Sequence, residues 1–120
     1  MLLNSSAFSA EITDSLVLLE LQKNNIPFTK EFLIRIKKES GNYKSKLSTE
    51  YNNIIGMKQP KRRKTLATGT NKYKHASYNC WKECIKDLKL FIEFRPPNQN
   101  ETYYQYMKRR QWNPYYINKK

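Results

Sequence analysis

The sequence predicts a mainly helical α+β domain that carries one small β-hairpin. Several stretches place apolar residues at the spacing of one helix face, whereas residues 56–78 combine proline, threonine and glycine in a pattern typical of a hairpin. The 120 residues fit one domain, and 38% hydrophobic residues give that domain enough material for a core. We therefore expect a single domain over residues 1–120, with its core at about residues 9–118.

The first predicted helix spans residues 9–24, and Ser9 is its expected N-cap. Pro27 separates this helix from the next one. The apolar positions that we expect near one face are Ile12, Leu16, Leu19 and Leu21.

The second predicted helix begins at Thr29, which we expect to be its N-cap. It ends near Glu39 or Ser40, because Gly41 stands where a helix C-cap is expected. Its predicted inner face consists of Phe32, Leu33 and Ile36. A short helix over residues 45–51 follows.

The hairpin predicted within residues 56–78 turns near Gly69, after a run of threonine and alanine. The clearest helix of the chain comes next, with Asn79 as its expected cap and Pro96-Pro97 as its end. Its predicted buried stripe consists of Trp81, Cys84, Ile85, Leu88, Phe91 and Ile92.

The C-terminal part of the chain is rich in aromatic residues. Asn98 and Glu101 have the spacing of a capping box for a last helix that reaches about Arg109, and a turn is expected at Pro114. The aromatic side chains are expected to pack on the core, with a saccharide-binding platform as the alternative. They are Tyr103, Tyr104, Tyr106, Trp112, Tyr115 and Tyr116.

The charge is strongly positive, with 23 Lys and Arg against 10 Asp and Glu and a net charge of +13. Such a charge favours binding to an anionic polymer, either nucleic acid, acidic lipid or cell-wall material. The densest cluster, Lys58 with residues 61–64, is expected to be a solvated loop. No apolar run approaches the ~20 residues that a membrane span needs.

The cysteines and the histidine predict no metal site and no cofactor. Cys80 and Cys84 are four residues apart on one predicted helix, where free core thiols are favoured over a disulfide. With His75 alone beside them they form a poor metal-ligand set. The first ten residues have no basic region before an apolar one, so we expect no signal peptide.

Several short motifs occur together in the middle of the chain. Glu39-Ser40-Gly41 ends the second helix, and a Tyr leads into a Trp-containing helix further on. The remaining members of the set are Ser45, Asn52, Asn53, Gly56, Met57, Lys58, Tyr78 and Trp81. In combination they resemble the glucosaminidase domains of the lysozyme superfamily, in the style of glycoside hydrolase family 73, in the variant of Bacteroidetes and their phages. The resemblance covers roughly residues 15–118.

This resemblance implies a lysozyme-like fold, with helices on one side of a cleft and a small hairpin lobe on the other. It implies hydrolysis of the β-1,4 bond after N-acetylglucosamine in the glycan strands of peptidoglycan, as by an N-acetylglucosaminidase. Glu39 matches the general acid, and Tyr78 matches a tyrosine that organises the sugar and the attacking water. Ser45, Asn52, Asn53, Gly56, Met57 and Lys58 match residues that bind substrate along the cleft.

The chemistry of Glu39 agrees with an acid role. Cleavage of a glycosidic bond needs a carboxylic acid that is still protonated near neutral pH. A helix C-terminus and partial burial both disfavour the carboxylate. Arg35, Lys37 and Lys38 act in the opposite direction, and the alternative is an exposed glutamate that pairs with Arg35 on a helix surface.

Other assignments remain open at this point. The Asn-Asn turn is either an ordinary turn or a pair of amides aimed at the sugar. Trp81 is expected in the core. Glu50 and Glu83 are expected at the surface, so no second catalytic carboxylate is assigned, and participation of the sugar's own acetamido group is a third route.

Two other classes of function compete with the hydrolase. One is a lysozyme-like binding or structural protein without turnover, for example a component of a phage particle. The other is a basic nucleic-acid binder, although the sequence shows no recognised nucleic-acid motif. For a hydrolase without a signal peptide, we expect a phage virion or the host cytoplasm as its location before delivery to the cell wall, with virion proteins as further partners.

Overall fold

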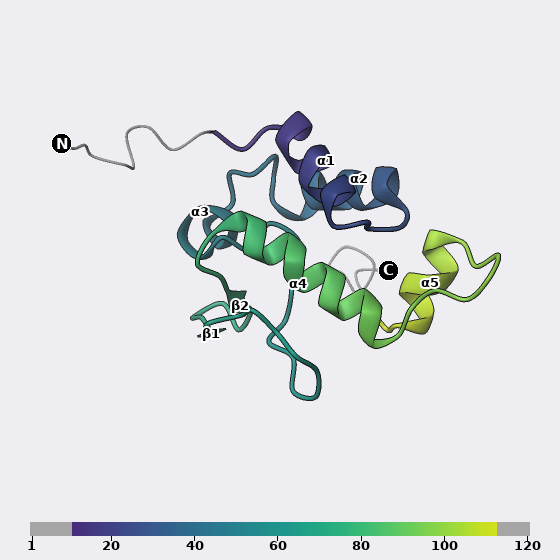
Figure 1. The fold of residues 1–120 in the computed structure, drawn as a ribbon. Helices are drawn as coiled ribbons and strands as arrows, with labels where there is room; N and C mark the ends of the chain where they lie inside the picture. The colour runs from purple at the N-terminus through teal and green to yellow at the C-terminus, as the bar shows by residue number, and fades with distance from the viewer. Residues whose placement is uncertain (1–10, 113–120) are drawn as a thin grey trace, which may run out of the picture.

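The computed structural model describes residues 11–112, which form helices around a small antiparallel sheet (Figure 1). The elements are α1 (Asp14–Lys23), α2 (Thr29–Glu39), α3 (Lys46–Tyr51), β1 (Gly69–Thr70), β2 (Ala76–Ser77), α4 (Trp81–Phe94) and α5 (Tyr103–Arg109). The prediction of a mainly helical, lysozyme-like α+β fold with one small hairpin is confirmed.

Helix α1 begins later than the sequence predicted. Thr13 is the N-cap, and its hydroxyl oxygen accepts a hydrogen bond from the Leu16 N–H at 3.2 Å. The predicted start at residue 9 is wrong, although Ser9 itself lies outside the described residues. The predicted inner face is right at Leu21 and wrong at Leu16 and Leu19, because packing against α2 and α4 buries Val17 and Glu20 instead.

Helix α2 ends as predicted but begins differently. Its N-cap residue is Phe28, in the left-handed conformation, and Thr29 instead donates its hydroxyl to the Ile26 carbonyl at 2.8 Å. Ser40 is the C-cap, and the following Gly41 has a φ of +57°. The Ser40 hydroxyl donates to the Ile36 carbonyl and accepts the Tyr43 N–H. These two hydrogen bonds of Ser40 therefore fix the end of α2, which carries Glu39.

The predicted hairpin is present, but the position predicted for its turn is wrong. Gly69 lies in β1 opposite Ser77, and the turn covers residues 71–75. Asn71 builds this turn, because its side-chain oxygen accepts the Tyr73 N–H at 2.9 Å and its own N–H donates to the His75 carbonyl. An asparagine side chain thus supplies the turn that the sequence analysis placed at a glycine.

Helix α4 carries the predicted stripe, with Cys84, Ile85, Leu88 and Ile92 buried and Trp81 and Phe91 half-buried. Its N-cap residue is Cys80 rather than Asn79, and it makes no side-chain cap bond. Both cysteines are free, but only Cys84 lies in the core, because Cys80 stands outside the helix and is exposed.

Helix α5 ends at Arg109 as predicted, but its capping box is formed by Thr102 and Gln105. Asn98 and Glu101 form a turn just before it, in which the Glu101 carboxylate accepts the Asn98 N–H at 2.8 Å. The helix starts at the next capping box because that box is complete. The Thr102 hydroxyl oxygen accepts the Gln105 N–H, and the Gln105 side-chain oxygen accepts the Thr102 N–H. Pro114, Tyr115 and Tyr116 lie outside the described residues.

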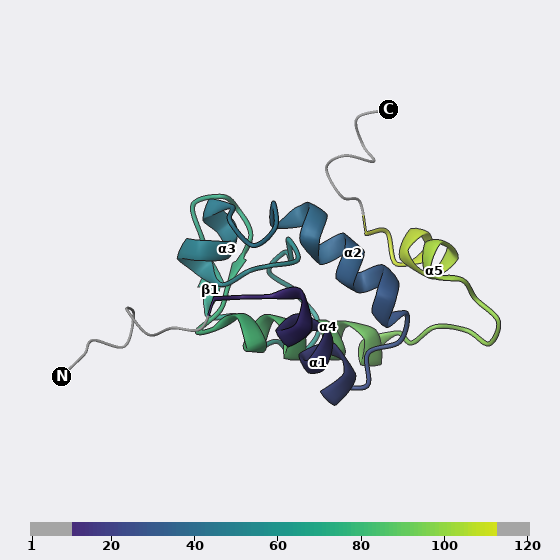
Figure 2. The same cartoon turned by 90° about the horizontal axis from the view of Figure 1, so that it is seen from above.

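Helix α4 forms the centre of the domain. In the view of Figure 1, α1 and α2 lie on one side of it, and the hairpin and the long loop before it lie on the other. Figure 2 shows α3 near the N-terminal end of α4 and α5 beyond its C-terminal end, with α2 between them. The buried core is Val17, Leu21, Ile26, Phe32, Ile36, Ile54, Ile55, Met57, Ala76, Tyr78, Cys84, Ile85, Leu88, Ile92, Tyr103, Tyr106 and Met107. Between residues 11 and 112, no helix is both long and apolar enough to cross a membrane.

Candidate active site

A cleft of about 840 Å³ lies beside the end of α2. Its walls come from the end of α2, the stretch that precedes the hairpin, the hairpin turn, and the C-terminal ends of α4 and α5. The residues that line it are Glu39, residues 56–63, His75, Phe91, Phe94 and residues 110–112. The fold thus brings the predicted acid together with Gly56, Met57 and Lys58.

The Glu39 carboxyl is sheltered in this cleft, with a side-chain exposure of 17%. Its Oε2 atom is buried and accepts no hydrogen bond from the described residues. Burial raises the pKa of Glu39 above its ordinary value, even though the nearby Arg35 and His75 act to lower it. A carboxyl in this state holds its proton to higher pH than a solvated one.

Arg35 does not lock Glu39 into a hydrogen-bonded ion pair. Its Nε atom is 4.0 Å from Glu39 Oε2, which is the outer limit of an ion pair and too long for a hydrogen bond. Lys37 points elsewhere, because its amine is 2.9 Å from the Asp14 carboxylate on α1. The alternative of a surface glutamate is therefore contradicted in its exposure, although Arg35 lies within ion-pair distance of Glu39.

Gly56 lies directly against the Glu39 carboxyl. A Cβ at this position would be 3.3 Å from Glu39 Oε1, and the φ of Gly56 is +74°. Both facts favour glycine, because any other residue would be strained and would crowd the acid. Gly56 therefore leaves the space beside Glu39 Oε1 free of a side chain.

Asn53 positions Gly56 by organising the turn of residues 53–57. Its side-chain amide donates to the carbonyls of Met57 and Ala76, both at 2.8 Å, and its side-chain oxygen accepts the Met57 N–H at 2.9 Å. The side chain is 1% exposed, and its amide hydrogens are both used. The turn is thereby fastened to β2 as well as to itself.

Asn52 and Ser45 also bond to protein rather than to the cleft. Asn52 donates to the Tyr78 carbonyl at 2.8 Å, and the Ser45 hydroxyl is the N-cap of α3. Ser45, Asn52 and Asn53 do not line the cleft. Their predicted contact with a sugar stays a prediction, and the geometry gives all three a supporting position behind the wall.

Tyr78 lies in the interior and does not line the cleft. It is 3% exposed, and its hydroxyl donates to Asp87 Oδ2 at 2.5 Å. Burial, together with the neighbouring Cys84 and Asp87, raises the pKa of the Tyr78 hydroxyl far above its ordinary value. The resemblance placed this tyrosine against the sugar, whereas the structure places it in the core, where it fixes Asp87.

Asp87 is a buried acid that the sequence analysis missed. Its carboxylate accepts hydrogen bonds from two nitrogens of Arg63, at 3.0 and 3.2 Å, and from the Thr65 hydroxyl and the Leu66 N–H. Burial acts to raise the pKa of Asp87, but the bonds from Arg63, Tyr78 and Leu66 outweigh it and hold the pKa below its ordinary value. The sequence feature that could have indicated this buried acid is the position of Asp87 within the apolar stripe of α4.

This network corrects the prediction for the cluster of Lys58 with residues 61–64, which we call the basic loop (residues 58–64). Arg63 has a side-chain exposure of 7% and anchors the loop to α4 through Asp87. The other cations of the basic loop are exposed as predicted, and they are Lys58, Lys61, Arg62 and Lys64. The loop is thus attached at one point and solvated elsewhere.

The aromatic residues divide between core and cleft. Tyr103 and Tyr106 are buried, as predicted, and Tyr104 is exposed. Trp112 packs edge-on against Phe91, with ring centres 4.8 Å apart, and both line the cleft. Trp112 therefore packs against the core, as predicted, and also lines the cleft.

No second carboxylate lines the cleft. All ten acidic residues of the chain lie within the described part, and among them only Glu39 reaches the lining. Glu50 is exposed, and Glu83 lies 3.7 Å from Lys86. His75 also lines the cleft, and its Nδ1 lies 2.8 Å from the Tyr73 carbonyl. Within residues 11–112, no group of three His, Cys, Asp or Glu side chains could hold a metal ion.

A helical domain with a small sheet and one sheltered carboxyl at a helix end has the architecture of the lysozyme-like domains. The chain belongs to the Glucosaminidase family, described as mannosyl-glycoprotein endo-beta-N-acetylglucosaminidase, whose match covers residues 18–119. No curated protein and no solved structure matches the chain. The family match contains every residue of the cleft lining.

Proposed function

We propose that this protein hydrolyses β-1,4 glycosidic bonds in the glycan strands of peptidoglycan, with Glu39 as the general acid. The observation that carries the proposal is the sheltered carboxyl of Glu39 on the wall of an open cleft. Membership of the Glucosaminidase family supports a glycan substrate. The lining of cations and aromatic rings suits a polymer with sugar rings and negative substituents.

In this proposal the protonated Glu39 donates its proton to the glycosidic oxygen as the bond to the anomeric carbon breaks. Gly56 leaves room for that oxygen beside Glu39 Oε1. Because the cleft has no second carboxylate, the positive charge at the anomeric carbon is best met by the 2-acetamido group of the sugar itself. Water then adds to the anomeric carbon, the bond to the acetamido oxygen breaks, and the proton released by the water returns to the Glu39 carboxylate, so that the sugar regains its acetamido group.

Glu39→Gln tests the acid role, because glutamine keeps the shape of the side chain and cannot donate an acidic proton. We expect the release of reducing ends from purified peptidoglycan to fall by 10²-fold or more, within the range for removing a general acid. Glu50→Gln is the matched control, since it makes the same change on an exposed helix outside the cleft. Equal release by wild type and Glu39→Gln would refute the catalytic assignment.

A wild-type protein that binds peptidoglycan but releases no reducing ends would instead establish the alternative of a lysozyme-like binding or virion protein. The absence of a second carboxylate is the observation that favours this alternative. Mass analysis of the released fragments separates the two outcomes, because only hydrolysis adds water across a glycosidic bond.

A further inference from the structure

The cleft carries far more positive than negative charge. Its lining includes five cations and one carboxylate, and the carboxylate belongs to Glu39. The cations are Lys58, Lys61, Arg62, Arg63 and Arg110. The sugar rings of a glycan are neutral, so proton transfer from Glu39 does not explain this charge.

Two of these cations have partners within the protein. Arg63 is held by Asp87. Arg110 donates to the Arg95 carbonyl at 2.9 Å, and its guanidinium lies 3.6 Å from the centre of the Phe91 ring. These contacts fix the two arginines as parts of the cleft wall.

The other three, Lys58, Lys61 and Arg62, are exposed and form no ion pair with any residue of the described range. They project from the basic loop, whose position is fixed by the bonds of Arg63, Thr65 and Leu66 to Asp87. Like charges gathered on a fixed loop repel one another, and the repulsion is relieved when an anion binds between them.

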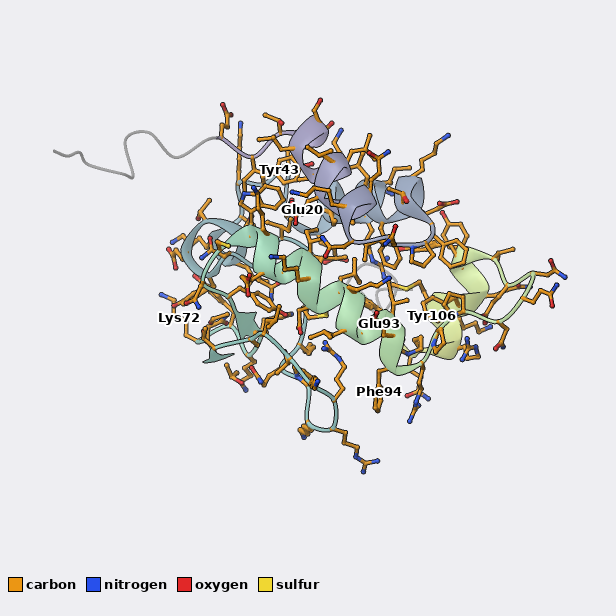
Figure 3. The ribbon with its side chains drawn as sticks, in the orientation of Figure 1. Glu20, Tyr43, Lys72, Glu93, Phe94 and Tyr106 are labelled. Atoms are coloured by element: carbon orange, nitrogen blue, oxygen red, sulfur yellow. The ribbon has the colours of Figure 1, made fainter. Side chains whose placement is uncertain are left out.

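Phe94 extends the same wall with an apolar surface. Its side chain is 46% exposed and lines the cleft. Figure 3 shows it projecting from the C-terminal end of α4 on the side of the basic loop. A ligand that combines carboxylates with aliphatic groups and sugar rings would meet cations and an aromatic ring together.

We propose that Lys61 and Arg62 of the basic loop form a subsite for carboxylates borne on the glycan strand, so that the protein selects carboxylated glycans over neutral ones. This inference rests on the proposed function and names the substrate feature that the cleft recognises. In peptidoglycan such carboxylates have two sources: the lactyl group on alternate sugars, where it is free, and the peptide stems attached to it.

The test compares wild type with Lys61→Gln/Arg62→Gln on three substrates: intact peptidoglycan, glycan stripped of its peptides by an amidase, and a neutral oligomer of N-acetylglucosamine. At low salt we expect kcat/KM of the double variant to fall about 10-fold or more on the carboxylated substrates and to stay unchanged on the neutral oligomer. A loss on stripped glycan assigns the lactyl carboxylate as ligand, and a loss on intact peptidoglycan alone assigns the stems.

Lys30→Gln/Lys108→Gln is the matched control, because it removes two exposed positive charges outside the cleft. An equal loss in this control, or an equal loss on the neutral oligomer, would overturn the subsite. A double variant that loses affinity for duplex DNA but not for glycan would also overturn it.

Binding measured in the Glu39→Gln background separates this inference from the proposed function. If wild type releases no reducing ends from any substrate, the proposed hydrolase activity fails. The subsite then stands if soluble carboxylated glycan fragments bind more weakly to the double variant and it fails if they bind equally.

Discussion

Glu39 and Asp87 are both sheltered acids with an arginine beside them, yet the structure gives them opposite properties. Asp87 accepts two bonds from Arg63 and further bonds from Thr65 and Leu66. Glu39 lies 4.0 Å from Arg35, and its buried Oε2 accepts no bond from the described residues. The pKa of Asp87 is held low, whereas burial raises the pKa of Glu39.

The comparison shows that hydrogen bonds decide the role of a buried acid here. A carboxylate that accepts several strong bonds is stabilised in its charged form, and it fastens one segment to another. A carboxyl that is desolvated without such bonds keeps its proton more readily and can donate it. Asp87 therefore holds the wall of the cleft, and Glu39 is available for chemistry inside it.

The largest expected effect on stability comes from Asp87→Asn. The change leaves the buried guanidinium of Arg63 without its carboxylate, and breaking such a pair costs about 3–5 kcal/mol. Chemical denaturation measures the loss, with Asp14→Asn as the control on the protein surface. A change no larger than that of the control would show that the network does not stabilise the fold.

Gly56→Ala should have the next largest effect, and it should lower both the stability of the fold and the rate of hydrolysis. A positive φ strains an alanine by about 1–3 kcal/mol. The new methyl group would also crowd Glu39 Oε1, so we expect hydrolysis to fall by more than the stability loss explains. Activity is measured at a temperature where the variant is fully folded, and Gly41→Ala, with a φ of +57° and open space around it, is the matched control.

Tyr78→Phe removes the hydrogen bond that the Tyr78 hydroxyl donates to Asp87, but it leaves the ring in the core. We expect a loss of stability of about 1.5–3 kcal/mol, as for a hydrogen bond to a charged group. Hydrolysis by the folded variant should change little, because Tyr78 does not line the cleft. A large fall in kcat at unchanged stability would restore the catalytic role that the resemblance implied.

The smallest effect is a pH dependence of stability that differs in sign between the two acids. Since the folded-state pKa of Glu39 is raised, its contribution to stability is greatest below about 4.5 and is lost as the pH rises through the folded-state pKa. The stability of Glu39→Gln relative to wild type should therefore rise from pH 4 to pH 7.

Asp87 has a lowered pKa, so its contribution is present above its ordinary value of 3.8 and is lost as the pH falls through the folded-state pKa. The deficit of Asp87→Asn should therefore shrink in acid. Thermal unfolding from pH 2 to pH 7 measures both trends. Parallel curves for Glu39→Gln and wild type would contradict the desolvation of Glu39.

The sequence predicted the elements better than their ends. The stripe of α4 and the Gly41 stop after α2 are local patterns, and both predictions are confirmed. The start of α1 and the cap of α2 were predicted wrongly. Thr13 caps α1 with its side chain, whereas the N-cap residue of α2 is Phe28, which makes no side-chain cap bond and which no capping rule would select.

The residues of the cleft likewise divide into those that a local motif predicted and those that it did not. Glu39, Gly56, Met57 and Lys58 meet in the cleft as the motifs suggested, because the motif turn folds back on the end of α2. His75 was not predicted as a member of the cleft wall, and Trp112 was predicted there only as the alternative to packing on the core. Their positions depend on how the hairpin and the segment after α5 pack, which no local pattern records.

By itself, the sequence determined the helical class of the chain, its positive charge and the acid at the end of α2, because periodicity and residue type are local properties. Only the tertiary structure decided that Glu39 is desolvated without being hydrogen-bonded, while Asp87 is fully bonded and Tyr78 is buried. Desolvation and bonding depend on neighbours brought together from distant segments, and those neighbours set the pKa of each acid.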